Sequence, residues 1–188
     1  MIIKKIYHQI QAFLTRKYKQ PVMISGYCCQ GIQLPRTRIS SSTFIDHPQS
    51  LHIEDNVYIG HYNFIEASNG LTIEKGVQIT NFCNISTHSS HISIRLYGDH
   101  YKEVTDHVGY VKGEIKIGSY TFVGPHSTIM PGTSIGKGCL IRAYSYVKGT
   151  FPDFSVIGGA PARIIGSTKD IDQPFIDDNP QLHTIYQE

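Results

Sequence analysis

Residues 123–140 of the chain read VGPHST-IMPGTS-IGKGCL, three consecutive six-residue units that each begin with a branched aliphatic residue. The spacing continues on both sides of this stretch, and the residues that keep it are Ile117, Val123, Ile129, Ile135, Ile141 and Val147. Two earlier series have the same period: Ile53, Ile59 and Ile65, then Ile73, Ile79 and Ile85. A strand repeats every two residues and a helix every 3.6 residues, so a period of six indicates a repeat architecture of short stacked strands.

The composition of each unit predicts how the chain turns. Gly and Pro gather between the aliphatic positions, where a chain that changes direction needs turn-forming residues. The fifth position is small, as at Thr121, Ser127, Thr133 and Ser145. One strand and one corner per unit give three sides per coil. We therefore expect an all-β fold over residues 21–168, a parallel β-helix of triangular cross-section with the aliphatic column inside.

The repeat is interrupted after Ile85 and becomes clear again at Ile117. Residues 89–110 form an excursion rich in polar, charged and aromatic side chains, which favours an ordered functional loop over a disordered insertion. Residues 1–20 have amphipathic helical spacing and predict a short helix packed on the main body, with a membrane-surface helix as the alternative. Residues 169–188 are polar and predict a surface tail with little regular structure.

Composition excludes several classes of protein. The chain has 188 residues and a formal net charge of +2, without a block of like charges, so it predicts one domain and no nucleic-acid partner, although a small anionic ligand stays possible. No apolar run is long enough for a membrane span. Cys28 and Cys29 are adjacent, while Cys83 and Cys139 occupy the small fifth position, which predicts free thiols and a cytoplasmic setting.

The hexads, the excursion and the terminal stretch Gly159-Ala160-Pro161-Ala162-Arg163 together resemble the hexapeptide-repeat acyltransferases. The resemblance covers about residues 40–166 and is strongest to the maltose and galactoside O-acetyltransferase branch and its capsule- and polysaccharide-modifying relatives. It implies a left-handed β-helix and a homotrimer with active sites between subunits. It also implies acetyl-CoA as the acyl donor, no required metal, and a hydroxyl of a sugar or glycan as the acceptor.

The resemblance also implies where the site lies. A catalytic His is expected in the Ser/Thr-rich stretch before the excursion, where His88 and His91 compete and the spacing from Ile85 favours His91. A neutral imidazole, with an ordinary pKa near 6.5, can take the proton of a sugar hydroxyl as it attacks the thioester. The expected coenzyme-binding residues are Gly124, Pro125, Ala143, Lys148, Gly159, Ala160, Pro161 and Arg163.

Two positions depart from the family pattern. Phe122 stands where many relatives have Trp, and Arg142-Ala143-Tyr144 replaces the usual Gly-Ala-Gly. Tyr144 and Tyr146 are therefore expected to crowd or reshape the coenzyme site.

Three other functions remain open at this point. The first is N-acetylation of an amino sugar or nucleotide sugar, with the acidic residues Asp99, Glu103 and Asp106 of the excursion holding an ammonium group. The second is a zinc lyase like γ-carbonic anhydrase, which needs three converging His, whereas His88 and His91 are only three residues apart. The third is a non-catalytic trimeric scaffold, which the polar, His-rich excursion disfavours.

Overall fold

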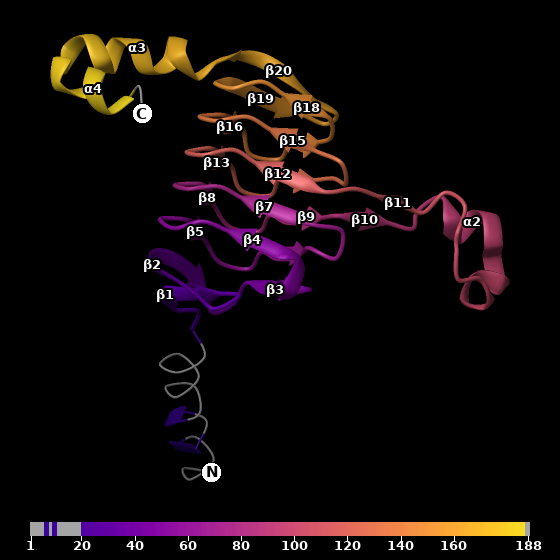
Figure 1. The fold of residues 1–188 in the computed structure, drawn as a ribbon. Coiled ribbons are helices and arrows are strands. Elements are labelled where there is room, and N and C mark those ends of the chain that lie inside the picture. Colours follow the sequence, from indigo (N-terminus) through magenta and orange to yellow (C-terminus); the bar gives the residue numbers. More distant parts are fainter. Residues whose placement is uncertain (1–5, 8, 11–19, 187–188) are drawn as a thin grey trace.

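A computed structural model of the chain describes residues 6–7, 9–10 and 20–186. Its main body is a stack of coils that rises from the N-terminal to the C-terminal part of the chain (Figure 1). Three sheets line the stack, and each coil contributes one strand to each of them. This arrangement confirms the parallel, β-helix-like stack predicted from the hexads.

The first sheet has eight strands, and we call it the eight-stranded sheet. Its strands are β1 (Met23–Cys29), β2 (Ile32–Ser40), β5 (Tyr58–Ile59), β8 (Gln78–Ile79), β13 (Phe122–Val123), β16 (Leu140–Ile141), β19 (Ser155–Gly159) and β20 (Ala162–Ser167). The pairs β1–β2 and β19–β20 are antiparallel and close the two ends of the stack, whereas the strands between them run parallel.

The other two sheets have five parallel strands each. The β14 sheet contains β3 (Phe44–Asp46), β6 (Phe64–Glu66), β9 (Asn84–Ser86), β14 (Thr128–Ile129) and β17 (Tyr146–Val147). The β15 sheet contains β4 (Leu51–Ile53), β7 (Leu71–Ile73), β12 (Ile115–Ile117), β15 (Ser134–Ile135) and β18 (Thr150–Phe151). A short 3₁₀ turn, η1 (Pro48–Ser50), joins β3 to β4.

The register between coils places each aliphatic residue directly on its counterpart. In the β15 sheet, for example, Ile117 pairs with Ile73 on one side and with Ile135 on the other. The column is fully buried and includes Ile59, Ile65, Ile73, Ile79, Ile85, Ile117, Ile129, Ile135 and Ile141. Burial of this aliphatic surface is the main term that stabilises the stack.

The small fifth positions satisfy the backbone at the corners. The hydroxyl of Ser127 donates to the carbonyl of Arg142 (3.1 Å) and that of Thr121 to the carbonyl of Gly136 (2.9 Å). Cys83 and Cys139 are buried at equivalent places, and their thiols donate to corner carbonyls in the same way. Burial raises the pKa of both thiols, which makes them poor nucleophiles and confirms them as small core residues.

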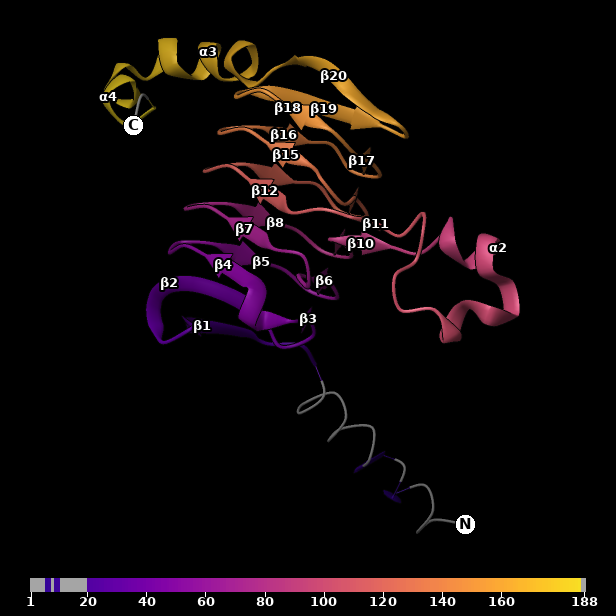
Figure 2. The ribbon, with the colours of Figure 1, turned by 45° about the vertical axis from the view of Figure 1, so that its right-hand side comes forward.

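The excursion is ordered. Its base is an antiparallel pair of β10 (His88–Ser89) and β11 (Val111–Lys112), and its tip holds α2 (Ser93–Tyr97) and the 3₁₀ helix η2 (Gly98–Glu103). Both ribbon views show it projecting from the side of the stack (Figures 1 and 2). The rings of Tyr97 and Tyr101 pack on His107 and form its small core.

The expectation of a C-terminal tail with little regular structure is wrong for the described part of that segment. Residues 168–186 form α3 (Thr168–Asp178), η3 (Pro180–Leu182) and α4 (His183–Tyr186). The Ser167 side chain caps α3 by accepting from the Lys169 N–H, and Ile176 is buried. The fold is therefore β in its stack and helical at this end and in the excursion.

The predicted helix over residues 1–20 lies mostly outside the described residues. Residues 6, 7, 9 and 10 of this segment are described, and they are helical. Within the described part of the chain, no helix combines the length and the apolar character needed to cross a bilayer.

Candidate active site

The excursion leaves the stack at the corner that joins the β14 sheet to the β15 sheet, between β9 and β12. His88 opens β10 at this corner. In the coil below, β6 pairs with β9 so that Glu66 lies against Ser86, two residues before His88. The parallel stack therefore brings the carboxylate of Glu66 under the imidazole of His88, although the two residues lie a full coil apart in the sequence.

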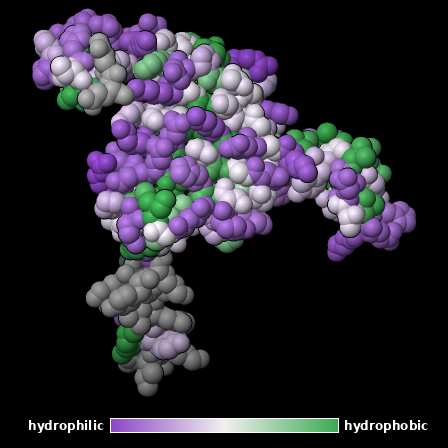
Figure 3. Space-filling model, in the orientation of Figure 1, coloured by the Kyte–Doolittle hydropathy of each residue, from purple (hydrophilic) through white to green (hydrophobic). Residues whose placement is uncertain are grey.

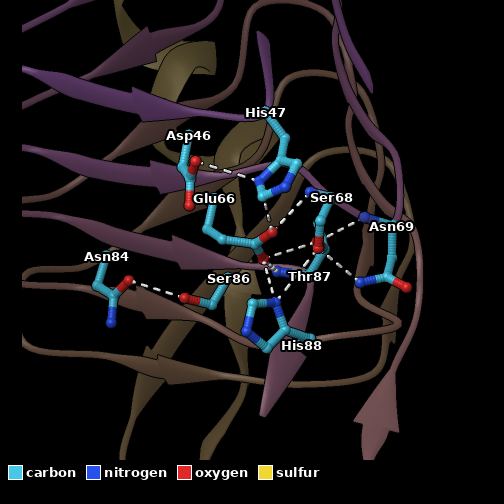
Figure 4. Close-up of polar contacts among 9 residues, drawn as sticks. All are labelled: Asp46, His47, Glu66, Ser68, Asn69, Asn84, Ser86, Thr87 and His88. Carbon is cyan, nitrogen blue, oxygen red and sulfur yellow. Dashed lines mark hydrogen bonds and ion pairs between the residues drawn. The ribbon is translucent and has the colours of Figure 1, made fainter. Parts of the chain in front are cut away.

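The side chains of Glu66 and His88 are in hydrogen-bond contact. The distance from Glu66 Oε2 to His88 Nδ1 is 2.9 Å, and Ser68 Oγ lies 3.3 Å from the same nitrogen (Figure 4). Glu66 is only 2% exposed. Three donors hold its carboxylate: the N–H of Ser68 (2.6 Å), the N–H of Thr87 (2.9 Å) and the hydroxyl of Thr87 (2.8 Å).

These contacts decide the charge of Glu66. Burial by itself raises the pKa of the carboxyl group, but the hydrogen bonds from Ser68 and Thr87 outweigh it and lower the pKa to about 2. The group is therefore an anion near pH 7. A carboxylate only accepts hydrogen bonds, so Nδ1 of His88 must carry the proton of this contact. In the neutral ring, Nε2 then keeps its lone pair and is available as a base.

The excursion also holds the ring of His88. Tyr110 stacks on it with ring centroids 5.5 Å apart and planes 11° apart. Tyr110 in turn lies 6.2 Å from the ring of His107 in the core of the excursion. His88 is thus fixed on one side by a buried carboxylate and on another by the excursion, while its side chain stays about one-third exposed (34%).

His91 lies in a different setting. It is exposed, its Nδ1 contacts Ser89 Oγ at 2.8 Å, and its carbonyl accepts from the Arg95 side chain. Among the described residues it has no acidic partner, whereas His88 has one. The geometry of a base held by a carboxylate is therefore found at His88 and not at His91.

Sequence reasoning missed Glu66, Ser68 and Thr87. The available signal was the length of a coil, because Ile65 and Ile85 stack in register and so Glu66 falls beside Ser86. His47 lies on the other side of Glu66. Its Nδ1 lies 3.2 Å from Asp46 Oδ1 and 3.9 Å from Glu66 Oε1 (Figure 4).

Six of the predicted coenzyme-binding residues lie along another corner, between the eight-stranded sheet and the β14 sheet. Gly124 and Pro125 follow β13, and Ala143 follows β16 one coil further on. A Cβ on Gly124 would lie 2.6 Å from the backbone nitrogen of Ala143, so this position tolerates no side chain. Gly159, Ala160 and Pro161 form the exposed turn between β19 and β20.

Lys148 and Arg163 are placed differently from each other. Arg163 lies on β20 opposite Gly158, close to this turn. Lys148 follows β17 and lies at the corner from which the excursion leaves. The β14 sheet separates the two corners, so one chain presents the His88 corner and the glycine-rich corner on opposite borders of the same face.

No three His, Cys, Asp or Glu side chains of the described residues converge as metal ligands would. The ring of His126 lies in a stack between the rings of Phe82 and Tyr144.

The state of Glu66 predicts how stability depends on pH. Its pKa falls from an ordinary 4.5 to about 2 in the folded chain. Its contribution to the free energy of unfolding is therefore complete above pH 4.5 and is lost as the pH falls toward 2. The shift corresponds to about 3 kcal/mol. We expect the free energy of unfolding, measured by urea titration, to fall more steeply between pH 5 and 3 for the wild type than for Glu66→Gln. Parallel curves for the two proteins would contradict the assigned charge.

Comparison with known proteins finds relatives among the acetyltransferases. Residues 114–149 match the family model described as bacterial transferase hexapeptide (six repeats). The probable acetyltransferase Rv3034c of Mycobacterium tuberculosis is 29% identical over 124 residues, which cover 66% of this chain and 39% of the relative. The galactoside O-acetyltransferase of Escherichia coli is 27% identical over 139 residues, which cover 73% of this chain and 64% of the relative. The chain thus spans less than two thirds of the length of these relatives.

A solved structure shows the same fold. The maltose O-acetyltransferase from Clostridium difficile 630 superimposes with a TM-score of 0.57 at 22% identity, covering 68% of this chain and 64% of that one. The chain thus contains a segment of hexapeptide repeats and is similar to acetyltransferases.

Proposed function

We propose that the chain transfers an acetyl group from acetyl-CoA to a hydroxyl of a sugar or glycan, with His88 as the general base. The observation that carries the proposal is the buried, ionised Glu66 at 2.9 Å from His88 Nδ1. This pair orients a base beside an exposed surface, in an architecture shared with acetyltransferases. The names of the relatives support the acetyl group and the sugar hydroxyl.

The proposed reaction is direct transfer. His88 Nε2 accepts the proton of the acceptor hydroxyl while its oxygen attacks the thioester carbonyl. Backbone N–H groups of a turn stabilise the tetrahedral oxyanion. The carbon–sulfur bond then breaks, and the imidazolium returns its proton to the coenzyme thiolate. Glu66 acts as a positioning residue, because it holds the ring through Nδ1 and stabilises the positive charge that forms on it.

This proposal reverses the preference for His91 that the spacing suggested. It also bears on the acceptor atom. The amine of an amino sugar, once neutral, attacks before it loses a proton, whereas a hydroxyl needs a base during the attack. A base held by a buried carboxylate therefore favours O-acetylation over the N-acetylation alternative.

We further propose a homotrimer of left-handed β-helices, with acetyl-CoA bound between the His88 corner of one subunit and the glycine-rich corner of the next. The two corners lie on opposite borders of the β14 sheet, so a neighbouring chain is a natural way to bring them together. The excursion carries exposed apolar side chains at Ile94, Leu96 and Val108, and residues of high hydropathy are visible on it in Figure 3. Such a surface fits contact with another subunit.

Shared sites predict complementation. Variants His88→Ala and Ala160→Trp should each be inactive, because the first lacks the base and the second has a bulky ring in the glycine-rich corner where the coenzyme is proposed to bind. Co-expressed chains should form mixed trimers in which some interfaces carry both lesions and others neither, and those free of lesions should restore partial activity. Purified mixed trimers without activity, from parents that fold, would place both halves of the site on one chain.

The function itself is tested with radiolabelled acetyl-CoA and a panel of sugars, amino sugars and nucleotide sugars. Label should pass to a hydroxyl of at least one acceptor with the wild type and not with His88→Ala. Transfer only to amino groups would support the N-acetyltransferase. Stoichiometric bound zinc with bicarbonate dehydration activity and no acetyl transfer would replace the proposal by the lyase.

A further inference from the structure

Four rings stack along the glycine-rich corner, and we call them the aromatic ladder: Tyr62, Phe82, His126 and Tyr144. Successive ring centroids are 5.2, 5.0 and 4.8 Å apart, with interplanar angles of 13°, 4° and 6°. The spacing matches the separation of neighbouring strands, so each coil adds one ring to the ladder.

The backbone of the ladder indicates that the rings matter. All four residues have φ between 58° and 59°, in the left-handed region. Bulky side chains are rare there, whereas Gly and Asn adopt it easily. Glycine would serve these corners without strain, so the ring at each position is not explained by the turn alone. Stacking occupies both faces of the rings inside the ladder, but only one face of Tyr144, the last ring.

The ladder is open at Tyr144. In the next coil the chain turns back through Gly159, Ala160 and Pro161, and none of these residues has an aromatic ring that could continue the ladder. Among the described residues, Tyr144 has a ring neighbour only on its His126 side. It is 71% exposed, more than Tyr62 at 53% or Phe82 at 50%. One face of a rigidly held ring is thus presented beside the glycine-rich turn.

Two arginines lie beside Gly158, where the chain enters this turn. Arg142 precedes Tyr144 by two residues, and its Cδ lies 3.4 Å from the position of a Cβ on Gly158. Arg163 is the cross-strand partner of the same Gly158. Both are exposed, and neither pairs with a carboxylate in the part of the chain that the structure describes. Guanidinium groups without acidic partners are suited to phosphate.

We propose that Tyr144, Arg142 and Arg163 form a nucleotide subsite, in which a nucleobase continues the aromatic ladder on Tyr144 and the arginines hold the phosphates. The subsite rests on the proposed function, since both substrates of that reaction can carry a nucleotide. Tyr144 and Arg142 occupy the two positions where the family pattern has Gly, so the subsite is a property of this chain. The base belongs either to the adenine nucleotide of the coenzyme or to a nucleotide-activated sugar acceptor.

Binding of three probes to the full chain, measured by calorimetry, tests the subsite. The probes are adenosine 3′,5′-bisphosphate, UDP and 4′-phosphopantetheine, which has no base. Tyr144→Leu should weaken binding of at least one nucleotide by roughly fivefold to 100-fold, the range expected for one stacked base, and Tyr144→Phe should restore it. Arg142→Gln should weaken the same nucleotide, and 4′-phosphopantetheine, which has no base to stack, should bind Tyr144→Leu and the wild type alike.

Tyr120→Leu is the matched control. Tyr120 is also exposed and has φ of 60°, but it lies at the corner between the β15 sheet and the eight-stranded sheet. This variant should bind both nucleotides as the wild type does. Loss of adenosine 3′,5′-bisphosphate alone assigns the base to the coenzyme, and loss of UDP alone assigns it to the acceptor.

The outcomes separate the subsite from the proposed function. If Tyr144→Leu binds both nucleotides with wild-type affinity, or if the wild type binds neither, the subsite is refuted even where acetyl transfer is observed. If Tyr144 is required for nucleotide binding but no acceptor is acetylated, the proposed reaction fails and the subsite stands.

Discussion

Replacing His88 with alanine is expected to lower kcat by about 10²- to 10⁴-fold, the usual contribution of a general base. The ring contributes no core packing, because it lies at the surface between Glu66 and Tyr110. The thermal midpoint should therefore change little, apart from the effect of leaving the Glu66 carboxylate without the N–H of His88. Steady-state rates with a responsive acceptor, measured beside the thermal midpoint, separate lost chemistry from lost structure.

His91→Ala is the control for this prediction. His91 is the same type of residue three positions away, but it has no buried carboxylate beside it. Its loss should leave kcat within a few-fold of the wild type. Glu66→Gln should keep the ring in place through a hydrogen bond but stabilise the imidazolium less, so an intermediate kcat is expected with little change in KM. A large loss for His91→Ala with normal turnover of His88→Ala would restore the assignment based on spacing.

The stack itself could be predicted from the sequence because its core has one simple rule. A single aliphatic residue per side must point inward, and the six-residue spacing of Ile117 to Val147 records that rule directly. The two extra residues between Ile65 and Ile73, compared with Ile129 and Ile135, mark a longer corner and appear as a shift of the same pattern. A side chain that is buried at the same place in every coil produces a periodic pattern in the sequence, and such a pattern can be recognised without a structure.

The candidate site has no such periodic pattern in the sequence. Glu66 and His88 meet because β6 and β9 pair in one particular register, which depends on the exact length of the intervening coil. Nothing in the local sequence around Glu66 distinguishes a buried carboxylate from an exposed one. The helix over residues 168–178 was missed for a similar reason, since its polar composition hides the contacts of Ile176 and the cap at Ser167.

The aromatic corners show a third limit. Aromatic residues in the left-handed region of φ contradict the local backbone preference, and only the stacking of their rings between coils explains them. The corner between the β15 sheet and the eight-stranded sheet shows a related dependence between coils. A Cβ on Gly76 would lie 2.5 Å from the Tyr120 ring of the next coil, so a large residue in one coil requires glycine in the coil below. These dependencies join residues about one coil apart, and a local window does not contain both members.

Ile135→Asp is expected to prevent folding. Ile135 is 1% exposed and stacks between Ile117 and Phe151 in the β15 sheet, where a carboxylate has neither a cationic partner nor water. Loss of the buried aliphatic side chain and burial of an unpaired charge or a protonated acid together cost on the order of 5 kcal/mol or more. This is comparable with the whole stability of many domains. Far-ultraviolet circular dichroism and thermal unfolding should therefore show an unfolded or aggregated chain.

Ser134→Asp is the control that makes this result specific to the interior. Ser134 is the preceding residue of the same strand, points to the outer face, and pairs across the sheet with Lys116. A carboxylate there gains a nearby cation and stays hydrated, so its thermal midpoint should lie within a few degrees of the wild type. Equal destabilisation by the two substitutions would mean that the strand itself does not tolerate Asp, and a folded Ile135→Asp protein would refute the inward register on which the description of the stack depends.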